Sequence, residues 1–325
     1  MKRWACLGLM SAAAFSGACE RQPASTAEAV TTVSGSTHPD TGAAGPDHPL
    51  KVTCTTGMIA DAVRRVGGSR VEVTALMGPG VDPHLYKATA GDTARLTGAD
   101  MVFYNGLVLE GKMTDVLVAL AARKPVIAVT RDTPPDLLLE PPAFAGHYDP
   151  HVWFDVSLWT RAVKTIGEAL AGYDPAHAAH YQSSTSAYLD ELTRLHEWCL
   201  ERCGELSAAE RVLITSHDAY NYFGRAYGFE VIGVQGISTE EQATARAIVD
   251  LSKLISDRRI KAIFTESSVS PKAIHAVMEN CRSAGWQVAE GGQLFSDAMD
   301  EPGKPAGNYV GMVKHNVNTI VEALR

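Results

Sequence analysis

From Leu50 onward, short runs rich in β-branched residues alternate with stretches of helical periodicity. Such alternation favours an α/β fold in which helices cover both faces of a parallel sheet. In the first half we predict strands at residues 51–55, 70–76, 101–104 and 126–129, and helices at residues 57–66, 91–98 and 109–121. The pattern restarts near Arg211, with strands predicted at residues 212–215, 230–234, 262–265 and 287–289, and helices at residues 220–227, 239–258, 271–284 and 309–324. The sequence therefore predicts two Rossmann-like lobes with parallel sheets.

Residues 174–206, between the two predicted lobes, carry one continuous helical pattern. The positions that recur at helical spacing are Tyr181, Tyr188, Leu192, Leu195, Cys199 and Arg202. Asp174 is suited to cap the start of this helix, and Pro175 suits a first helical position. Roughly thirty residues at a rise of about 1.5 Å per residue make a rod of about 45 Å. One long rigid helix of this kind joins the lobes and restrains their closure, so we expect small motions.

The first 48 of the 325 residues differ in character from the rest. Residues 1–18, MKRWACLGLMSAAAFSGA, have a basic start, an apolar middle and small residues at the end, which is typical of a signal peptide. That apolar run is too short for a permanent membrane-spanning helix. Residues 19–48 are rich in Ala, Ser, Thr, Gly and Pro and lack apolar periodicity, so we expect a flexible tether. The predicted domains are then residues 1–18, 19–48, 49–173 (N-terminal lobe), 174–206 (linking helix) and 207–325 (C-terminal lobe).

Cys19 directly follows Ser16-Gly17-Ala18, an arrangement that resembles a bacterial lipoprotein signal. In such proteins the cysteine is lipidated and becomes the new N-terminus. The alternative is a plain secretory leader with an incidental cysteine. Either interpretation predicts an exported protein, in the periplasm or at the outer face of the cytoplasmic membrane, and lipidation of Cys19 would anchor it there.

Charge and cysteine content limit the other partners. A formal net charge of −8 gives no support to nucleic-acid binding, and it would not repel a cation. The cysteines of the predicted lobes and linking helix are Cys54, Cys199, Cys203 and Cys281. An exported chain could oxidise them, but no pairing follows from the sequence. We expect ordinary semi-buried residues, including Cys199 and Cys203, which share a helix face but have no further zinc ligands nearby.

One short triplet occurs twice, as Asp82-Pro83-His84 and as Asp149-Pro150-His151. Proline fixes its own φ angle and pushes the preceding residue toward extended geometry. In both copies a stiff turn therefore presents an imidazole, and preorganisation of this kind lowers the entropy lost on binding. The repetition predicts two metal ligands from one lobe.

Two further candidates, His217 and Asp297, follow predicted strands of the second lobe. Because ligands of open α/β sheets bind beyond the carboxyl ends of the strands, we expect these two side chains to meet His84 and His151 in the cleft between the lobes. Three imidazoles and a carboxylate suit zinc. Each residue alone has an ordinary interpretation, as a surface histidine or as an aspartate that caps a turn.

Several neighbouring residues have two interpretations. Glu266 and Ser267 end a predicted strand and are suited to orient a ligand imidazole, or else Ser267 or Ser268 caps the next helix. His147 is either a fifth, transient ligand or an exposed loop residue, and we favour the loop residue. The histidines on predicted helices lack partners at ligand spacing, and we interpret them as structural: His177, His180, His196, His275 and His315.

From Leu50 to Arg325 the chain resembles the receptors of bacterial zinc and manganese ABC importers, within them the TroA-like type. The resemblance lies in DPHLYKAT, DPHVWFDVSLW, SHDAYNYFGRAYGFEVIGVQGISTEEQ, AIFTESSVSPK, GGQLFSDAM and NYVGMVKHNVNTIV. It implies a binding protein and not an enzyme, with His84, His151, His217 and Asp297 as ligands of the transported ion. The ion would be passed to the permease of an ABC importer. We expect a monomer.

The resemblance leaves the metal open between Zn²⁺ and Mn²⁺. Manganese-preferring members of the family typically place glutamate where His217 stands, and imidazole at that position favours zinc. Dedicated zinc receptors often have a long His- and acid-rich loop, whereas the corresponding region here has only His147. A bidentate Asp297 would raise the coordination number and admit manganese.

Two other functions use the same sequence features. A zinc-dependent hydrolase could employ the histidine cluster with Glu266 or Asp218 as general base, but four protein ligands leave no position for a catalytic water. A receptor for an organic ligand such as an iron chelate would require a pocket lined by aromatic or arginine side chains. The converging histidines argue against this third function.

Overall fold

The computed structural model describes residues 48–325, which belong to one compact unit. The predicted signal peptide, Cys19 and the tether up to residue 47 lie outside the described residues. Among the residues that are described, no helix combines the length and apolarity needed to cross a membrane.

The N-terminal lobe is built on a four-stranded parallel sheet of order β2-β1-β3-β4. Its strands are β1 (Leu50–Cys54), β2 (Val71–Ala75), β3 (Met101–Tyr104) and β4 (Val126–Ala128), and its helices are α1 (Gly57–Gly67), α2 (Ala90–Gly98) and α3 (Thr114–Ala121). The helix predicted from residue 109 is correct only from Thr114. Before it the chain makes a left-handed turn, in which Leu107 and Val108 have φ angles of 53° and 65°. The buried carboxylate of Glu110 stabilises this turn by accepting the backbone N–H groups of Asn105 and Gly106.

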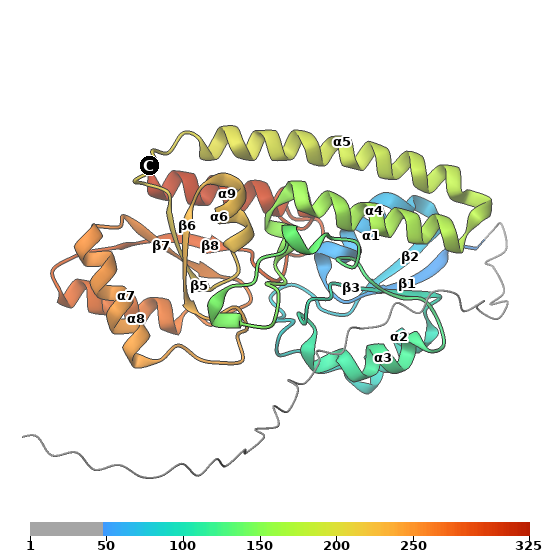
Figure 1. Cartoon of the computed structure of the whole chain (residues 1–325), viewed down its shortest axis with the longest axis horizontal. Coiled ribbons are helices and arrows are strands. Elements are labelled where there is room, and N and C mark those ends of the chain that lie inside the picture. The colour runs from blue at the N-terminus through green and yellow to red at the C-terminus, as the bar shows by residue number, and fades with distance from the viewer. Residues whose placement is uncertain (1–47) are drawn as a thin grey trace, which may run out of the picture. The chain divides into compact units, whose positions relative to one another are not determined.

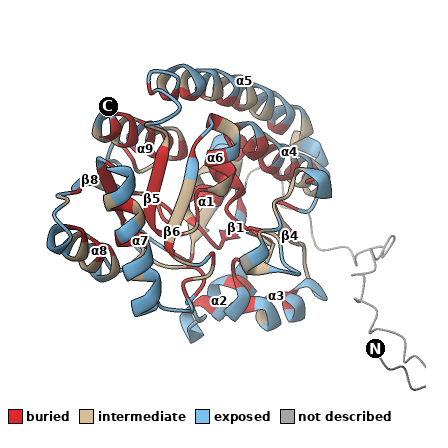
Figure 2. Cartoon of the chain, turned by 60° about the vertical axis from the view of Figure 1, so that its left-hand side comes forward, coloured by how far each residue is buried: buried red, intermediate tan, exposed pale blue. Residues whose placement is uncertain are grey.

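The C-terminal lobe contains two parallel strand pairs, β5 (Val212–His217) with β6 (Glu230–Gln235), and β7 (Ala262–Glu266) with β8 (Ala289–Leu294). Strand β5 lies beside β7 and is buried along its whole length (Figure 2). The helices of this lobe are α6 (Asn221–Tyr227), α7 (Ala245–Arg258), α8 (Lys272–Ser283) and α9 (Tyr309–Leu324). The lobe therefore has the parallel α/β build that the sequence predicts.

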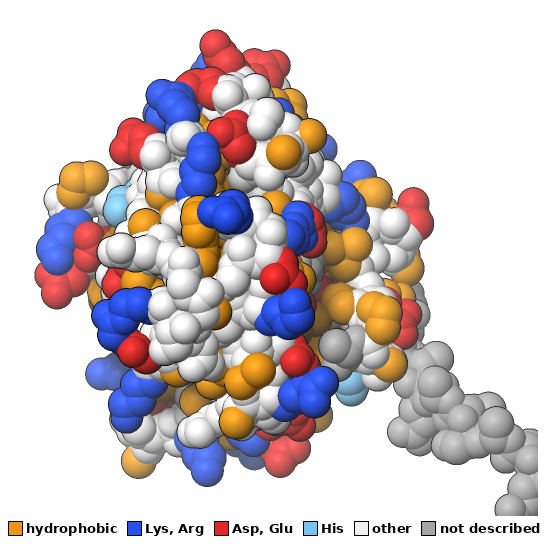
Figure 3. Space-filling view, turned by 90° about the vertical axis from the view of Figure 1, so that its left-hand side faces the viewer, with side chains coloured by type: hydrophobic (Ala, Val, Ile, Leu, Met, Phe, Trp, Pro, Cys, Tyr) orange, Lys and Arg blue, Asp and Glu red, His pale blue; other side chains and the backbone are white. Residues whose placement is uncertain are grey.

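Opposite charges are interspersed on the outer face formed by α7 and α8 (Figure 3). Arg246 pairs with Asp250, and Lys253 pairs with Asp257, each one helical turn apart. Alternation of sign along a helix is the pattern of a solvated face. This end of the molecule thus gathers no charge of one sign.

Two predicted elements of the C-terminal lobe are misplaced. The strand predicted at residues 287–289 is Ala289–Leu294, because the glycines that suggest a turn belong to the strand. A Cβ atom at Gly291 would lie 2.5 Å from the ring of Phe264, so the strand requires glycine to pack there. The helix predicted from residue 239 begins at Ala245, where the side chain of Thr244 accepts the N–H of Ala247 as a cap. Residues 236–244 form a loop instead.

The N-terminal lobe ends with α4 (Val156–Tyr173), and the 26-residue α5 (Ala178–Cys203) connects the two lobes. At a rise of about 1.5 Å per residue, α5 is about 39 Å long. It packs on α1 and α4 and then on α9, so it runs along both lobes (Figure 1). The positions predicted to recur at helical spacing are buried except Arg202, which is half-buried. Asp174 does not cap the helix backbone: its carboxylate contacts the His177 ring and the Tyr181 hydroxyl instead.

Candidate metal centre

The four predicted ligands come together between the two lobes. His84 follows β2, His151 precedes α4, His217 is the last residue of β5, and Asp297 follows β8. One donor atom from each lies within 4.8 Å of the other three. The side chains are buried, with between 0 and 4% of each residue exposed. Sequence segments that are far apart thus form one interior site, two side chains from each lobe.

The donor atoms have the spacing of a small coordination shell. Nε2 of His151 lies 3.3 Å from Nε2 of His84 and 3.4 Å from Nε2 of His217. The two oxygens of Asp297 lie 3.4 Å from Nε2 of His151 and 3.3 Å from Nε2 of His217. A tetrahedral ion with bonds of about 2.0–2.1 Å separates its donors by about 3.3 Å. The four printed separations match that value, and all the donors lie within 4.8 Å of one another, so the cluster is of a size that can hold a zinc-sized cation.

The oxygens of Asp297 point to the same conclusion. Neither has a hydrogen-bond partner of good geometry among the described residues, although the carboxylate is buried. A buried carboxylate without hydrogen bonds is costly unless a positive charge compensates it. The protonated rings of His151 and His217 supply that charge in the metal-free protein, and a cation bound between the three imidazoles would supply it in their place.

Two of the imidazoles are oriented by carboxylates behind them. Nδ1 of His217 lies 2.5 Å from Glu266, which also accepts the backbone N–H of His217 at 2.9 Å. Nδ1 of His151 lies 2.7 Å from Asp149. A carboxylate at Nδ1 fixes the tautomer and leaves the lone pair of Nε2 for a metal. The orienting role predicted for Glu266 thus has the geometry it requires.

The alternative prediction, that Ser267 or Ser268 caps the next helix, is wrong. Helix α8 begins at Lys272 and has no side-chain cap. The hydroxyl of Ser268 contacts the hydroxyl of Ser296 at 2.9 Å instead. Ser267 is linked through its backbone, by an N–H that donates to the carbonyl of Leu294. Neither serine therefore orients a ligand imidazole or starts the helix.

The repeated triplet works through its aspartates as well as its prolines. The N–H of His84 donates to Oδ1 of Asp82, and the N–H of His151 donates to Oδ1 of Asp149, each at 2.9 Å. An aspartate that accepts the N–H two residues on forms an Asx turn. Sequence reasoning assigned the stiffness to proline and missed this role of Asp82 and Asp149. The two-residue spacing was the signal that could have revealed it.

The site favours positive charge at two of its imidazoles. Burial alone disfavours the imidazolium of His151, but Asp149 and Asp297 outweigh it and raise the pKa of His151 to about 9. Burial is likewise outweighed at His217, where Glu266 and Asp297 raise the pKa well above its ordinary value. Burial lowers the pKa of His84 to about 3. Burial alone would raise the pKa of Asp297, but the charged rings of His217 and His151 outweigh burial and hold this pKa well below its usual range.

His147 does not join the cluster. It is exposed in the loop before the second triplet, where its ring lies 5.2 Å from the ring of Phe144. The interpretation as an exposed loop residue agrees with this position. The five histidines predicted to be structural each contact another partner: His177 contacts Asp174, His180 the Gly67 carbonyl, His196 Tyr227, His275 Glu290 and His315 the Gln293 carbonyl. Their structural interpretation is therefore supported.

The cysteines of the described residues are free and fully buried, not semi-buried as predicted. Burial raises the pKa of Cys199 and of Cys203 to about 12 in each case. Thiols in this state are poor metal ligands, because the thiolate is the ligand. These cysteines pack as small apolar side chains.

Two parallel α/β lobes joined by a long helix, with a buried cluster of three imidazoles and one carboxylate between them, define a metal-binding type of solute-binding protein. Residues 52–323 match the family described as the periplasmic component A of the zinc-uptake complex, and the chain belongs to this family.

Named relatives agree with the family. The manganese-binding lipoprotein MntA of Bacillus subtilis is 46% identical over 287 residues, 88% of this chain and 93% of that protein. The zinc-binding protein TroA of Treponema pallidum is 46% identical over 284 residues, 87% of this chain and 91% of that protein. A solved structure of the periplasmic zinc-binding protein TroA from Treponema pallidum superposes with a TM-score of 0.83 at 44% identity, covering 85% of this chain and 99% of that chain.

Proposed function

We propose that this protein captures a divalent transition metal outside the cytoplasmic membrane and delivers it to the permease of an ABC importer, with zinc preferred over manganese. The ligands are His84, His151, His217 and Asp297. The observation that carries the proposal is the buried convergence of these four side chains, whose donor atoms lie within 4.8 Å of one another. A zinc-binding and a manganese-binding relative are equally similar to this chain, at 46% identity, so their names do not choose the metal. The imidazole of His217 favours zinc.

The hydrolase alternative has no support from the family or from the relatives' names. Both oxygens of Glu266 are occupied by His217, one by the ring and one by the backbone N–H. A general base must be able to reach a substrate or a water. The cluster therefore serves binding, and its metal is cargo.

We further propose the predicted division of the chain: a signal peptide at residues 1–18, a tether at 19–48, lobes at 49–173 and 207–325, and a linking helix at 174–206. Cys19 would carry a lipid that anchors a monomeric receptor to the membrane. MntA of Bacillus subtilis is named a lipoprotein, which supports this part of the proposal. Replacement of Cys19 by serine should release the protein from membranes into the soluble fraction, and retention of the variant on membranes would contradict the anchor.

The test of the function is metal analysis of the purified protein, stripped with a chelator and then offered zinc and manganese in competition. One tightly bound zinc per chain that manganese does not displace supports the proposal. Comparable binding of both ions would instead make it a dual receptor. A protein that takes up no stoichiometric metal would overturn the four-ligand site.

Replacement of His217 tests the basis of the metal preference. We expect His217→Glu to lower the ratio of zinc to manganese affinity by about tenfold or more, because an oxygen ligand replaces nitrogen. His147→Glu, which adds the same charge outside the cluster, serves as the control. The measurement is a competition titration of both ions, and an unchanged ratio in His217→Glu would contradict the preference.

A further inference from the structure

Each triplet aspartate uses its second oxygen to contact the opposite lobe. Oδ1 of Asp82 and of Asp149 accepts the N–H of the ligand histidine, as described above. Oδ2 of Asp82 accepts the hydroxyl of Thr239 at 2.5 Å, and Oδ2 of Asp149 accepts the amide of Asn221 at 3.1 Å. Both donors belong to the C-terminal lobe. The turns that present the two N-terminal imidazoles are thus tied across the interface between the lobes.

The two hydrogen bonds across the interface differ in how much the orientation of the ligand imidazole depends on them. The ring of His151 is also bound directly by Asp149, so its orientation does not depend on the turn alone. The ring of His84 has no carboxylate hydrogen bond among the described residues, and its Nε2 contacts His151. His84 is also the most exposed of the four ligands, at 4%. Its position therefore depends on its Asx turn and on whatever holds Asp82.

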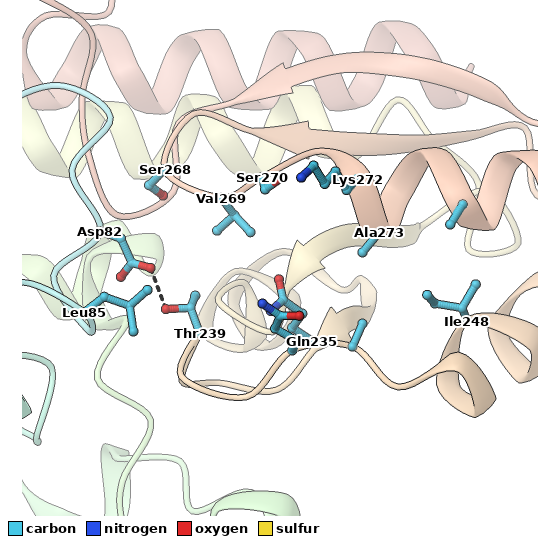
Figure 4. Close-up of a pocket in the computed structure, with 13 residues that line it drawn as sticks. Asp82, Leu85, Gln235, Thr239, Ile248, Ser268, Val269, Ser270, Lys272 and Ala273 are labelled. Atoms are coloured by element: carbon cyan, nitrogen blue, oxygen red, sulfur yellow. Dashed lines mark hydrogen bonds between the residues drawn. The ribbon is translucent and has the colours of Figure 1, made fainter.

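Thr239 lies in the loop of residues 236–244, between β6 and α7, where it is buried although most of its neighbours are exposed or half-buried. The loop borders two cavities at the junction of the lobes. One, of about 500 Å³, is lined by Asp82 and Thr239 among others (Figure 4), and the other, of about 300 Å³, is lined by His84 and Glu240 among others. The hydrogen bond from Thr239 to Asp82 joins the loop to the opposite lobe in the wall of the larger cavity.

We propose that Thr239 is a positioning residue for metal binding: its hydroxyl holds Asp82, Asp82 holds the turn of His84, and loss of this bond lets the metal leave faster. The inference rests on the proposed function, because it assigns a residue to the retention of the same metal. In this arrangement the C-terminal lobe controls a ligand that belongs to the N-terminal lobe. Separation of loop 236–244 from Asp82 would therefore loosen the turn that holds His84.

The variant Thr239→Val removes the hydroxyl and keeps the shape of the side chain. We expect zinc to dissociate about threefold to tenfold faster, the effect of one lost hydrogen bond to a carboxylate that is half-buried. Thr239→Ser keeps the hydroxyl and should restore the rate to within about twofold of the parent. The measurement is the release of zinc into an excess of chelator, followed by stopped-flow spectroscopy on the whole protein.

Two variants of the same loop region serve as controls. Thr244→Val makes the same chemical change at the cap of α7 and should lower the unfolding temperature without changing the release rate. Glu240→Gln breaks the ion pair with Lys112 across the lobes, at 2.7 Å. The side chains of Lys112 and Glu240 are 38% and 45% exposed, so we expect loss of this ion pair to change the release rate by less than about twofold.

A second measurement probes the link from Thr239 to His84 without metal. In the metal-free protein, hydrogen exchange of peptides that contain the His84 amide should be faster in Thr239→Val than in the parent and in Thr244→Val. A parent protein that binds no metal would overturn the proposed function and this inference together. A parent that binds one zinc, with equal release rates for the parent and Thr239→Val, or with a serine variant as fast as the valine variant, would overturn the inference alone.

Discussion

At the scale of single residues, the imidazole of His217 is held by one carboxylate at two points, its ring and its backbone. We expect Glu266→Gln to weaken zinc binding by about 10- to 100-fold, because glutamine keeps the shape but loses the charge that makes the ring a stronger ligand. Glu290→Gln, at a half-exposed glutamate on the neighbouring strand, is the matched control. Isothermal titration of both variants with zinc checks the expectation, and equal affinities would argue against an orienting role for Glu266.

The raised pKa values at His151 and His217 predict release of protons when metal binds. Without metal, both imidazoles are largely protonated at pH 7, because the pKa of His151 is about 9 and that of His217 is well above its ordinary value. A metal needs neutral imidazole, so binding at pH 7 should release about two protons, and affinity should rise as pH rises through about 9, where His151 loses its proton. His84, with a pKa of about 3, contributes none. Calorimetry at pH 7 in buffers of different ionisation enthalpy counts the protons, and a count near zero would contradict the prediction.

The same shift has the opposite consequence for the metal-free fold. Because the folded pKa of His151 lies above its ordinary value of 6.5, its contribution to stability is fully present below that value. The contribution is lost as pH rises through about 9. High pH thus favours the metal-bound protein and weakens the metal-free one.

At the scale of elements, α4 and α5 approach closely at one glycine. A Cβ atom at Gly167 would lie 2.2 Å from the hydroxyl oxygen of Thr185, a β-branched residue on α5 with little freedom to move. We expect Gly167→Ala to destabilise the protein by about 1–3 kcal/mol, because overpacking exceeds the gain in helix propensity. Gly172→Ala, in the same helix but with open space around the new Cβ, should be neutral or stabilise by up to about 1 kcal/mol. Urea denaturation of both variants measures this, and equal midpoints would contradict the close contact.

Local patterns predicted most elements, and tertiary contacts explain the exceptions. Helix α9 has the bounds that its periodicity predicts, from Tyr309 to Leu324. Strand β8 was misplaced because Gly291 and Gly292 resemble a turn when Phe264 is not known to lie above them. The start of α7 was misplaced because a Thr-Glu-Glu run resembles a helix N-terminus. Thr239 is instead bound to Asp82 of the other lobe.

In the candidate metal site, too, local sequence patterns predicted some features and tertiary contacts determine the others. The convergence of the three histidines and Asp297 could be predicted because these residue types are typical metal ligands and stand at strand ends or in repeated turns. The residues that hold these side chains in place could not be predicted from the sequence, except Glu266. Asn221 and Thr239 are ordinary polar residues in the sequence, and only the docking of the lobes brings them to the triplet aspartates.

At the scale of the whole molecule, one hydrophobic core extends through both lobes and the connecting helices. The indole of Trp153 donates to the carbonyl of Ser296, and the hydroxyl of Tyr309 donates to the carbonyl of Trp153. With α5 along both lobes, these contacts resist a wide hinge motion.

We therefore expect small-angle scattering of the folded part to give a radius of gyration of about 19 Å with or without zinc, differing by no more than a few tenths of an ångström. A lysozyme-sized standard measured alongside controls for calibration. A contraction of several ångströms on adding zinc would show that the helix does not restrain the lobes.

The order of the ligands along the chain has a consequence for folding. Because the donors come from positions as distant as His84 and Asp297, an unfolded chain offers no preformed site, and both lobes must fold and dock before one exists. An ion that binds the folded chain alone stabilises it by mass action, about 4 kcal/mol when free metal exceeds the dissociation constant a thousandfold. The cargo thus protects its carrier from proteases, and each delivery returns the carrier to its most degradable form.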